Sequence, residues 1–243
     1  MKRTLAFILF SGWACLSFGR INLPDSLPKG LLSLGYGYQL SLFDLNARYG
    51  GHGALHGSFG FIRGAWELGL GTEFLFGANV KEDVLAPLRA PGGELIGEDH
   101  QLAEVDLRQR GLFLGMHLGR SFRLGRQSLV LSARAGWLAH WIRFQNPGNT
   151  FKPIQGEYRA GYDRFSSGFA IGEQLAYRYL GRNRLINFEI ALQFSQAFIQ
   201  LRRNIQLDNP AVKPNNRFDG LAGFQARWII PFYSKKDPGT LYY

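Results

Sequence analysis

Five histidines are the side chains best suited to acid–base chemistry at neutral pH. They are His52, His56, His100, His117 and His140. A histidine beside a serine or an aspartate could activate a nucleophile for hydrolysis or acyl transfer. No spacing around these five residues marks such a nucleophile, although His100 does follow Asp99. We therefore predict no catalytic residue and no enzymatic activity.

Metal ions and cofactors also lack a recognisable site. No group of histidines and carboxylates has the spacing of metal ligands. Two glycine-rich pieces, LGYGYQ from Leu34 and GGHGALHG from Gly50, lack the strand, turn and helix of a phosphate-binding loop. We predict neither a metal nor a cofactor.

A second set of reactive side chains is charged and lies at alternate positions within apolar runs. It comprises Glu67, Glu73, Arg134, Arg178, Glu189 and Arg227. An unpaired charge in a low-dielectric interior is very costly. If these residues face an interior, we expect them to form a network of ion pairs there.

The elements that would position these residues are strands. Leu185 to Ser195, LINFEIALQFS, shows the cleanest alternation: Ile186, Phe188 and Ile190 fall on one face and Asn187 and Glu189 on the other. A period of two indicates β structure, because a helix would scatter both sets around its circumference. Eight such runs occur, at about residues 32–42, 52–61, 66–77, 111–122, 128–144, 164–180, 185–195 and 218–233.

The connections between these runs alternate between short and long. Those at residues 62–65, 123–127 and 181–184 are short, whereas those at 78–110, 145–163 and 203–217 are long. An even strand number with alternating short turns and long loops is typical of an outer-membrane barrel. We predict an all-β, eight-stranded antiparallel up-and-down transmembrane β-barrel, or ten strands if residues 94–106 form an extra hairpin.

The direction of the apolar face separates a membrane barrel from a soluble barrel of the lipocalin type. Small residues and opposite charges on the less apolar face suit the narrow interior of an eight-stranded barrel. Aromatic residues of the apolar face gather near the strand ends, as two membrane interfaces require. The predicted aromatic girdles include Trp66, Tyr177, Tyr179 and Phe232 at the periplasmic ends and Phe76, Trp141, Phe165 and Phe198 at the outer ends.

One residue disagrees with this assignment of faces. Glu173 falls on the apolar face, between Ile171 and Leu175. We expect a β-bulge that shifts the alternation there. The alternative is a functional carboxylate at the lipid boundary.

The N-terminus predicts export. Lys2 and Arg3, the apolar run from Leu5 to Leu16, and the small residues Ser17 and Gly19 read as a signal peptide spanning residues 1–19. Residues 20–30 are then a periplasmic segment, 31–233 the barrel and 234–243 a periplasmic tail. Cleavage removes Cys15, so no disulfide is expected. It also lowers the charge from 28 − 18 = +10 to 26 − 18 = +8.

The basic charges suggest lipid contact rather than nucleic acid, which an exported protein would not meet. The predicted periplasmic rim comprises Arg63, Arg120, Arg123, Arg126, Arg182 and Arg184, and anionic head groups suit it. Residues 79–108 are acidic, and could bind divalent cations that bridge lipopolysaccharide or pair with the basic loop at 202–217. Expected partners are outer-membrane lipids and lipopolysaccharide, the assembly machinery during biogenesis, and an unidentified envelope protein.

Several short motifs resemble a family of outer-membrane β-barrel proteins of Bacteroidota. They are NVKEDVL from Asn79, GYDRFSSG from Gly161, NRLINFE from Asn183, the pair Arg202 and Arg203, WIIPFY from Trp228, and the terminal Tyr242 and Tyr243. The resemblance implies the fold and the outer membrane of a Gram-negative bacterium, but no activity. It spans residues 77–233.

The sequence therefore predicts a barrel whose lumen is filled by side chains, with a non-enzymatic structural or accessory role in the cell envelope. A narrow channel for ions or small solutes is the second interpretation. A lipid-modifying outer-membrane enzyme is the third.

Overall fold

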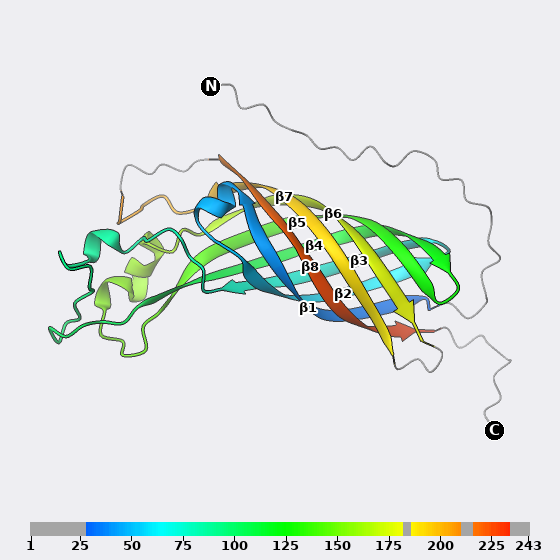
Figure 1. Ribbon diagram of the computed structural model, residues 1–243. Coiled ribbons are helices and arrows are strands. Elements are labelled where there is room, and N and C mark those ends of the chain that lie inside the picture. The colour runs from blue at the N-terminus through cyan, green and yellow to red at the C-terminus, as the bar shows by residue number, and fades with distance from the viewer. Residues whose placement is uncertain (1–27, 182–185, 210–215, 234–243) are drawn as a thin grey trace.

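The computed structural model describes residues 28–181, 186–209 and 216–233. Eight antiparallel strands form one closed ring in chain order, and β8 pairs with β1 to close it (Figure 1). The strands are β1 (Gly30–Phe43), β2 (His52–Arg63), β3 (Trp66–Gly77), β4 (Asp106–Leu124), β5 (Gln127–Gln145), β6 (Ser166–Leu180), β7 (Asn187–Leu201) and β8 (Asn216–Phe232). The predicted eight-stranded up-and-down barrel is confirmed.

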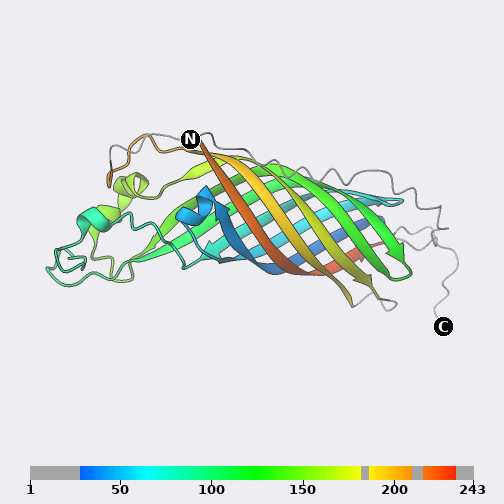
Figure 2. The same cartoon turned by 45° about the horizontal axis from the view of Figure 1, so that its top comes forward.

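The two ends of the barrel differ (Figure 2). At the turn end, β2–β3 and β4–β5 are joined by two-residue turns in which Gly64 and Gly125 adopt positive φ angles of 63° and 66°. At the loop end, the chain forms long connections that contain four short 3-10 helices. These are η1 (Asp44–Ala47), η2 (Ala86–Leu88), η3 (Lys152–Ile154) and η4 (Gly156–Gly161). The described chain begins and finishes at the turn end (Figure 1).

Residues 94–106 do not add a hairpin to the ring. Their pairing is limited to an isolated bridge between Ile96 and Leu102, and a second isolated bridge joins Tyr49 to Val80. The ten-stranded alternative is therefore wrong. Nor do the described residues include a helix with the length and apolar character needed to cross a membrane.

The apolar faces of the strands point outward. Phe188, Leu192 and Trp228 are 37%, 62% and 59% exposed, whereas Glu189 and Arg227 on the same strands are buried. This inverts the polarity of a water-soluble protein, in which an exposed apolar surface of this extent is unusual. The period of two therefore assigns each strand residue to the correct face.

The interior has two tiers. Towards the turn end it is polar, and the charged residues described below fill it. Towards the loop end it is mainly apolar, although the buried His140–Asp219 pair and the buried His52 and Gln109 lie there too, and its apolar side chains continue into the loops as one packed cluster. Members of that cluster include Leu75, Leu138, Ile142 and Ile199 from the strands and Leu45, Tyr49, Val84, Leu85, Leu95, Phe151 and Ile154 from the loops.

Several strand bounds differ from those predicted. Strand β4 begins at Asp106 rather than near Gly111, and β7 extends to Leu201 rather than Ser195. Strand β6 begins at Ser166, and Arg164 lies before it with a positive φ of 52°. The long strands β4 and β5, of 19 residues each, extend one wall of the barrel towards the loop end (Figure 1).

Candidate functional site

The lumen gathers all six charged residues of the predicted polar network from five strands. Each is buried. Arg178 on β6 forms ion pairs of 2.7 Å with both Glu67 on β3 and Glu189 on β7. Glu189 also pairs with Arg227 on β8 at 2.8 Å. Because each carboxylate has a cation within contact distance, the cost of burying these charges is offset.

Arg134 and Glu73 form a second, separate ion pair nearer the loop end. Arg134 Nη1 donates to Glu73 Oε1 at 2.6 Å. Its guanidinium carbon also lies 4.6 Å from the centre of the Phe113 ring, a cation–π distance. Glu73 is 2% exposed, so this pair is almost fully shielded from solvent.

Four glutamines complete the network and were not among the predicted site residues. Gln39 and Gln225 donate to Glu73 at 3.1 and 2.9 Å, and Gln193 accepts from Arg134 at 2.7 Å. Gln174 accepts from Arg227. The alternation could have identified them, because each glutamine lies on the inward face of its strand between outward apolar residues.

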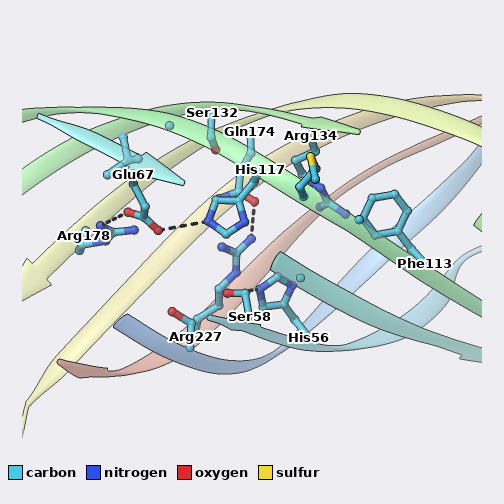
Figure 3. Close-up of a pocket in the computed structure, with 16 residues that line it drawn as sticks. His56, Ser58, Glu67, Phe113, His117, Ser132, Arg134, Gln174, Arg178 and Arg227 are labelled. Carbon is cyan, nitrogen blue, oxygen red and sulfur yellow. Dashed lines mark hydrogen bonds and ion pairs between the residues drawn. The ribbon is translucent and has the colours of Figure 1, made fainter. Parts of the chain in front are cut away.

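The remaining space in the polar lumen is small. A cavity of about 30 Å³ lies among His56, Ser58, Glu67, His117 and Arg227 (Figure 3). A single water needs about 10–15 Å³ on this measure, so the cavity holds about two waters. This cavity is therefore too small for a solute larger than a few waters.

Ser58, His56 and Glu73 have the hydrogen-bond order of a catalytic triad. His56 Nε2 lies 3.1 Å from Ser58 Oγ, and His56 Nδ1 lies 3.4 Å from Glu73 Oε1. A working triad also needs room for a substrate carbonyl and donors for the developing oxyanion. The 30 Å³ cavity beside them excludes a lipid or peptide substrate, so this geometry supports a structural hydrogen-bond chain.

His52, His117 and His140 are also structural in their contacts, whereas His100 is exposed in the loop between β3 and β4. His117 Nε2 lies 3.3 Å from Glu67, and the buried His140 lies 2.8 Å from Asp219. His52 Nδ1 lies 3.3 Å from the Gly50 carbonyl oxygen. No cluster of three or more histidines, cysteines and carboxylates suited to a metal occurs among the described residues.

Above the apolar tier, loop residues form a charged cap, which we define as Arg48, Glu82, Asp163, Arg164, Arg203 and Asp208. Glu82 accepts from Arg48 Nε and Arg164 Nε, each at 2.7 Å. Arg164 also pairs with Asp208 at 2.5 Å, and Arg203 pairs with Asp163 at 2.6 Å. Burial by itself raises the pKa of Glu82, but the Arg48 and Arg164 guanidiniums outweigh it and hold this pKa below its ordinary value.

The charged cap joins three motifs that are far apart in the chain. Glu82 belongs to NVKEDVL, Arg164 to GYDRFSSG, and Arg203 to the pair that follows β7. The acidic loop was expected to pair with the basic loop at 202–217. In the described part of the chain it forms no ion pair with Arg202, Arg203 or Arg217, and Lys213 lies outside the described residues. Arg164 instead bridges the acidic Glu82 to Asp208.

The predicted aromatic girdles lie on the outward face. At the turn end, Trp66, Tyr177, Tyr179 and Phe232 are partly or well exposed; at the loop end, so are Phe76, Trp141, Phe165 and Phe198. Phe165 precedes β6 rather than lying in it, yet its ring packs 6.2 Å from that of Trp141. Each end of the barrel therefore carries outward rings that flank an aliphatic band.

The predicted basic rim is only partly a surface feature. Arg63 and Arg126 are exposed at the turn end, and Arg120 lies over the Trp66 ring at 5.6 Å. Arg123 is on the inward face of β4 and donates to the Gly64 carbonyl oxygen. Arg182 and Arg184 lie outside the described residues, as do the predicted signal peptide and the terminal tyrosines.

The expected bulge at Glu173 is wrong. Residues 166–180 pair without interruption with both β5 and β7, and Glu173 stands opposite Ala133 and Phe194. The alternation therefore keeps its phase, and the carboxylate points outward among apolar side chains. No hydrogen bond or ion pair of Glu173 is present in the described part of the chain.

Comparisons with known proteins give structural likeness alone. No protein-family model matches the chain, and no curated protein matches it either. Among solved structures, Neisserial surface protein A matches with a TM-score of 0.45 at 10% identity, over 84% of this chain and 97% of that one. Ail, the attachment invasion locus protein of Yersinia pestis, matches at 0.42 and 11% identity, over 84% and 99% of the two chains. The N-terminal β-barrel domain of Pseudomonas aeruginosa OprF matches at 0.38 and 13% identity, over 84% and 98%. At such low identities and scores, these similarities carry no residue role or activity over to this chain.

Proposed function

We propose that this protein is an outer-membrane β-barrel with a closed lumen and a structural or interaction role in the cell envelope. The observation that carries the proposal is the inverted polarity of the ring. Leucine, phenylalanine and tryptophan side chains cover its outside, and buried ion pairs fill part of its inside. In hydrocarbon, only a closed ring satisfies every strand hydrogen bond, because it has no free edge.

The two ends of the barrel support one orientation. In outer-membrane barrels the short turns face the periplasm and the longer loops face outward. The turn end would then lie in the periplasm, with Arg63, Arg120 and Arg126 near anionic head groups. The loop end would face outward. Its exposed loop residues would form the surface that contacts other molecules, and the mostly buried charged cap would hold those loops together.

The closed lumen argues against the two alternative functions. A channel needs a continuous wet path, whereas this interior combines a cavity of 30 Å³ with an apolar tier above it. An enzyme acting on lipid needs its nucleophile within reach of the acyl chain or ester, whereas Ser58 faces inward. A structural or accessory role remains the function that the geometry supports best.

Fractionation after expression in a Gram-negative host tests the location. We expect the protein in the outer-membrane fraction, with heat-modifiable mobility on electrophoresis. External protease should cut within residues 78–105 or 146–165 and spare the turns. Recovery as a soluble monomer, or cleavage of the turns in intact cells, would contradict the proposal.

Purification in mild detergent tests the accessory role. Stable co-purification of a defined envelope protein should depend on the loop end. Replacing residues 86–103 by a short linker should abolish it, while heat-modifiable mobility is retained. If the partner still binds this variant, the loop end is not the interaction surface.

A further inference from the structure

Three arginines form a patch on the outward face of β4 and β5 near the loop end. We call Arg108, Arg110 and Arg143 the arginine patch. Arg108 stands directly opposite Arg143 in the strand ladder. Arg110, one outward position nearer the turn end on β4, stands between Phe76 on β3 and Trp141 on β5.

The positive charge of the arginine patch is not balanced by the protein. Asp106 pairs with Arg108 at 2.8 Å. In the described parts of the chain, neither Arg110 nor Arg143 has an ion pair with a carboxylate, and electrostatic repulsion from Arg143 and Arg108 acts on Arg110. Like charges placed directly opposite on a sheet are destabilising. The arrangement therefore favours a bound anion that the protein itself does not supply.

The position of the patch indicates which anion. Phe76 and Trp141 belong to the loop-end girdle, and such rings lie at the level of lipid head groups. Arg110 shares this level, and Arg108 and Arg143 lie just beyond it. A guanidinium presents paired donors that match the oxygens of a phosphate. A head-group phosphate of a lipid in the outer leaflet would meet all three side chains from the side of the membrane.

We propose that Arg108, Arg110 and Arg143 form a binding site for the phosphate of an outer-leaflet lipid. The site rests on the proposed membrane location, and it names a ligand for one part of the barrel surface. The flanking Phe76 and Trp141 rings would contact the apolar part of the same lipid. The turn end offers a matched control, because Arg63 and Arg120 also face outward there, on either side of Trp66.

Lipid titration of the purified barrel tests the site. The probes are bisphosphorylated lipid A and the same lipid without phosphates, added to detergent-solubilised protein and followed by native mass spectrometry. We expect the Arg110→Gln/Arg143→Gln variant to bind the phosphorylated probe at least tenfold more weakly than wild type. The Arg63→Gln/Arg120→Gln variant should lose no more than about twofold, because its two arginines stand on either side of Trp66 and not directly opposite each other. The dephosphorylated probe should bind weakly to all three proteins. Equal binding of the phosphorylated probe by the two double variants would overturn the proposal.

A stability measurement separates this site from a general effect of charge removal. Without phosphorylated lipid, Arg143→Gln should raise the thermal unfolding midpoint, because it relieves repulsion by Arg108. With the lipid, wild type should gain more in that midpoint than the variant does. Inorganic phosphate at the same concentration should produce no such gain, and an equal gain with inorganic phosphate would overturn the lipid assignment. Heat-modifiable mobility of every variant reports the barrel itself, so failure of the site and failure of the proposed function are distinguishable.

Discussion

Arg134 and Glu73 form the simplest ion pair in the lumen. Among the described residues, the one further ionic partner of either is His56, which contacts Glu73. Removing one member of a buried pair leaves an uncompensated charge and typically costs about 3–5 kcal/mol. We expect Arg134→Leu to lower the free energy of unfolding in lipid vesicles by about that amount. Denaturant titration of the reconstituted barrel measures it.

The matched Glu73→Leu and Arg134→Leu/Glu73→Leu variants complete a double-mutant cycle. The double variant should lose less than the sum of the two single losses, because neither charge is then stranded. Strict additivity would show that the 2.6 Å contact contributes no coupling energy.

The same glutamate-to-leucine substitution can be tested on both faces of the barrel wall, at the outward Glu173 and at the inward Glu189. Glu173 points outward without a partner, whereas Glu189 is held by Arg178 and Arg227. We expect Glu173→Leu to raise the free energy of unfolding by about 1 kcal/mol, since a carboxylate in hydrocarbon is unfavourable. Glu189→Leu should lower it by several times as much. Destabilisation by Glu173→Leu would contradict the outward, lipid-facing assignment.

At the scale of the structural element, the charged cap should respond to acid before the strands do. The pKa of Glu82 is held below its ordinary value, so the unfolded cap takes up a proton at higher pH than the folded cap. The pairing therefore contributes stability above the ordinary glutamate pKa, and this contribution is lost as pH falls through the lowered folded value. We expect the protection factors of amides in residues 79–85 and 161–165, which correct for the slower intrinsic exchange in acid, to fall below about pH 4, while those of strand amides stay high.

The Glu82→Gln variant provides the control for this acid response. It removes the carboxylate but keeps the side-chain length, so cap exchange should already be faster at pH 7 and should change less on acidification. An unchanged acid profile in this variant would show that Glu82 does not couple the cap to pH.

The strands were predictable because one physical rule acts on each of them. Along each strand, successive side chains point alternately out of and into the barrel, and apolar residues alternate with small or polar ones accordingly. Glu173 departs from this pattern of residue types, but the strand pairing around it stays in register. Strand β4 was shortened in the prediction because Asp106, Arg108 and Arg110 are polar on its outward face. Beyond the apolar band both faces of a strand can be polar, so the alternation disappears although the pairing continues.

The charged cap and the two-tier interior could not be predicted in the same way. Glu82, Arg164 and Asp208 lie in three different loops, and no local pattern brings them together. The apolar tier could not be predicted either. Its inward residues, such as Leu75, Leu138 and Ile142, look like exceptions to the alternation, because the inward face is otherwise polar. Their role depends on packing against loop residues such as Val84 and Leu85.

At the scale of the whole molecule, the closed interior predicts an electrically silent barrel. Reconstituted into planar bilayers, the wild-type protein should show no stepwise ion conductance, because the apolar tier interrupts any wet path. The Arg134→Leu variant enlarges only the lower cavity and should stay silent as well. Wild-type conductance that changes with Arg134 or Glu189 would favour the narrow channel instead.

The strands differ in length, so the barrel wall extends farther on one side than on the other. Strands β4 and β5 are seven residues longer than β2 and β3, which are 12 residues each. The strand register divides this extra length between the two ends: at the loop end, residues 106–108 of β4 lie beyond β3 and residues 141–145 of β5 lie beyond β6. At about 3.4 Å per residue, the wall extends about 10–17 Å past its neighbours there. Bacterial surfaces carry a dense coat of sugar chains, and anything recessed beneath it is hard to touch. In the proposed orientation, this paired and therefore rigid extension would hold the loops of one side away from the lipid surface, where other molecules can contact them.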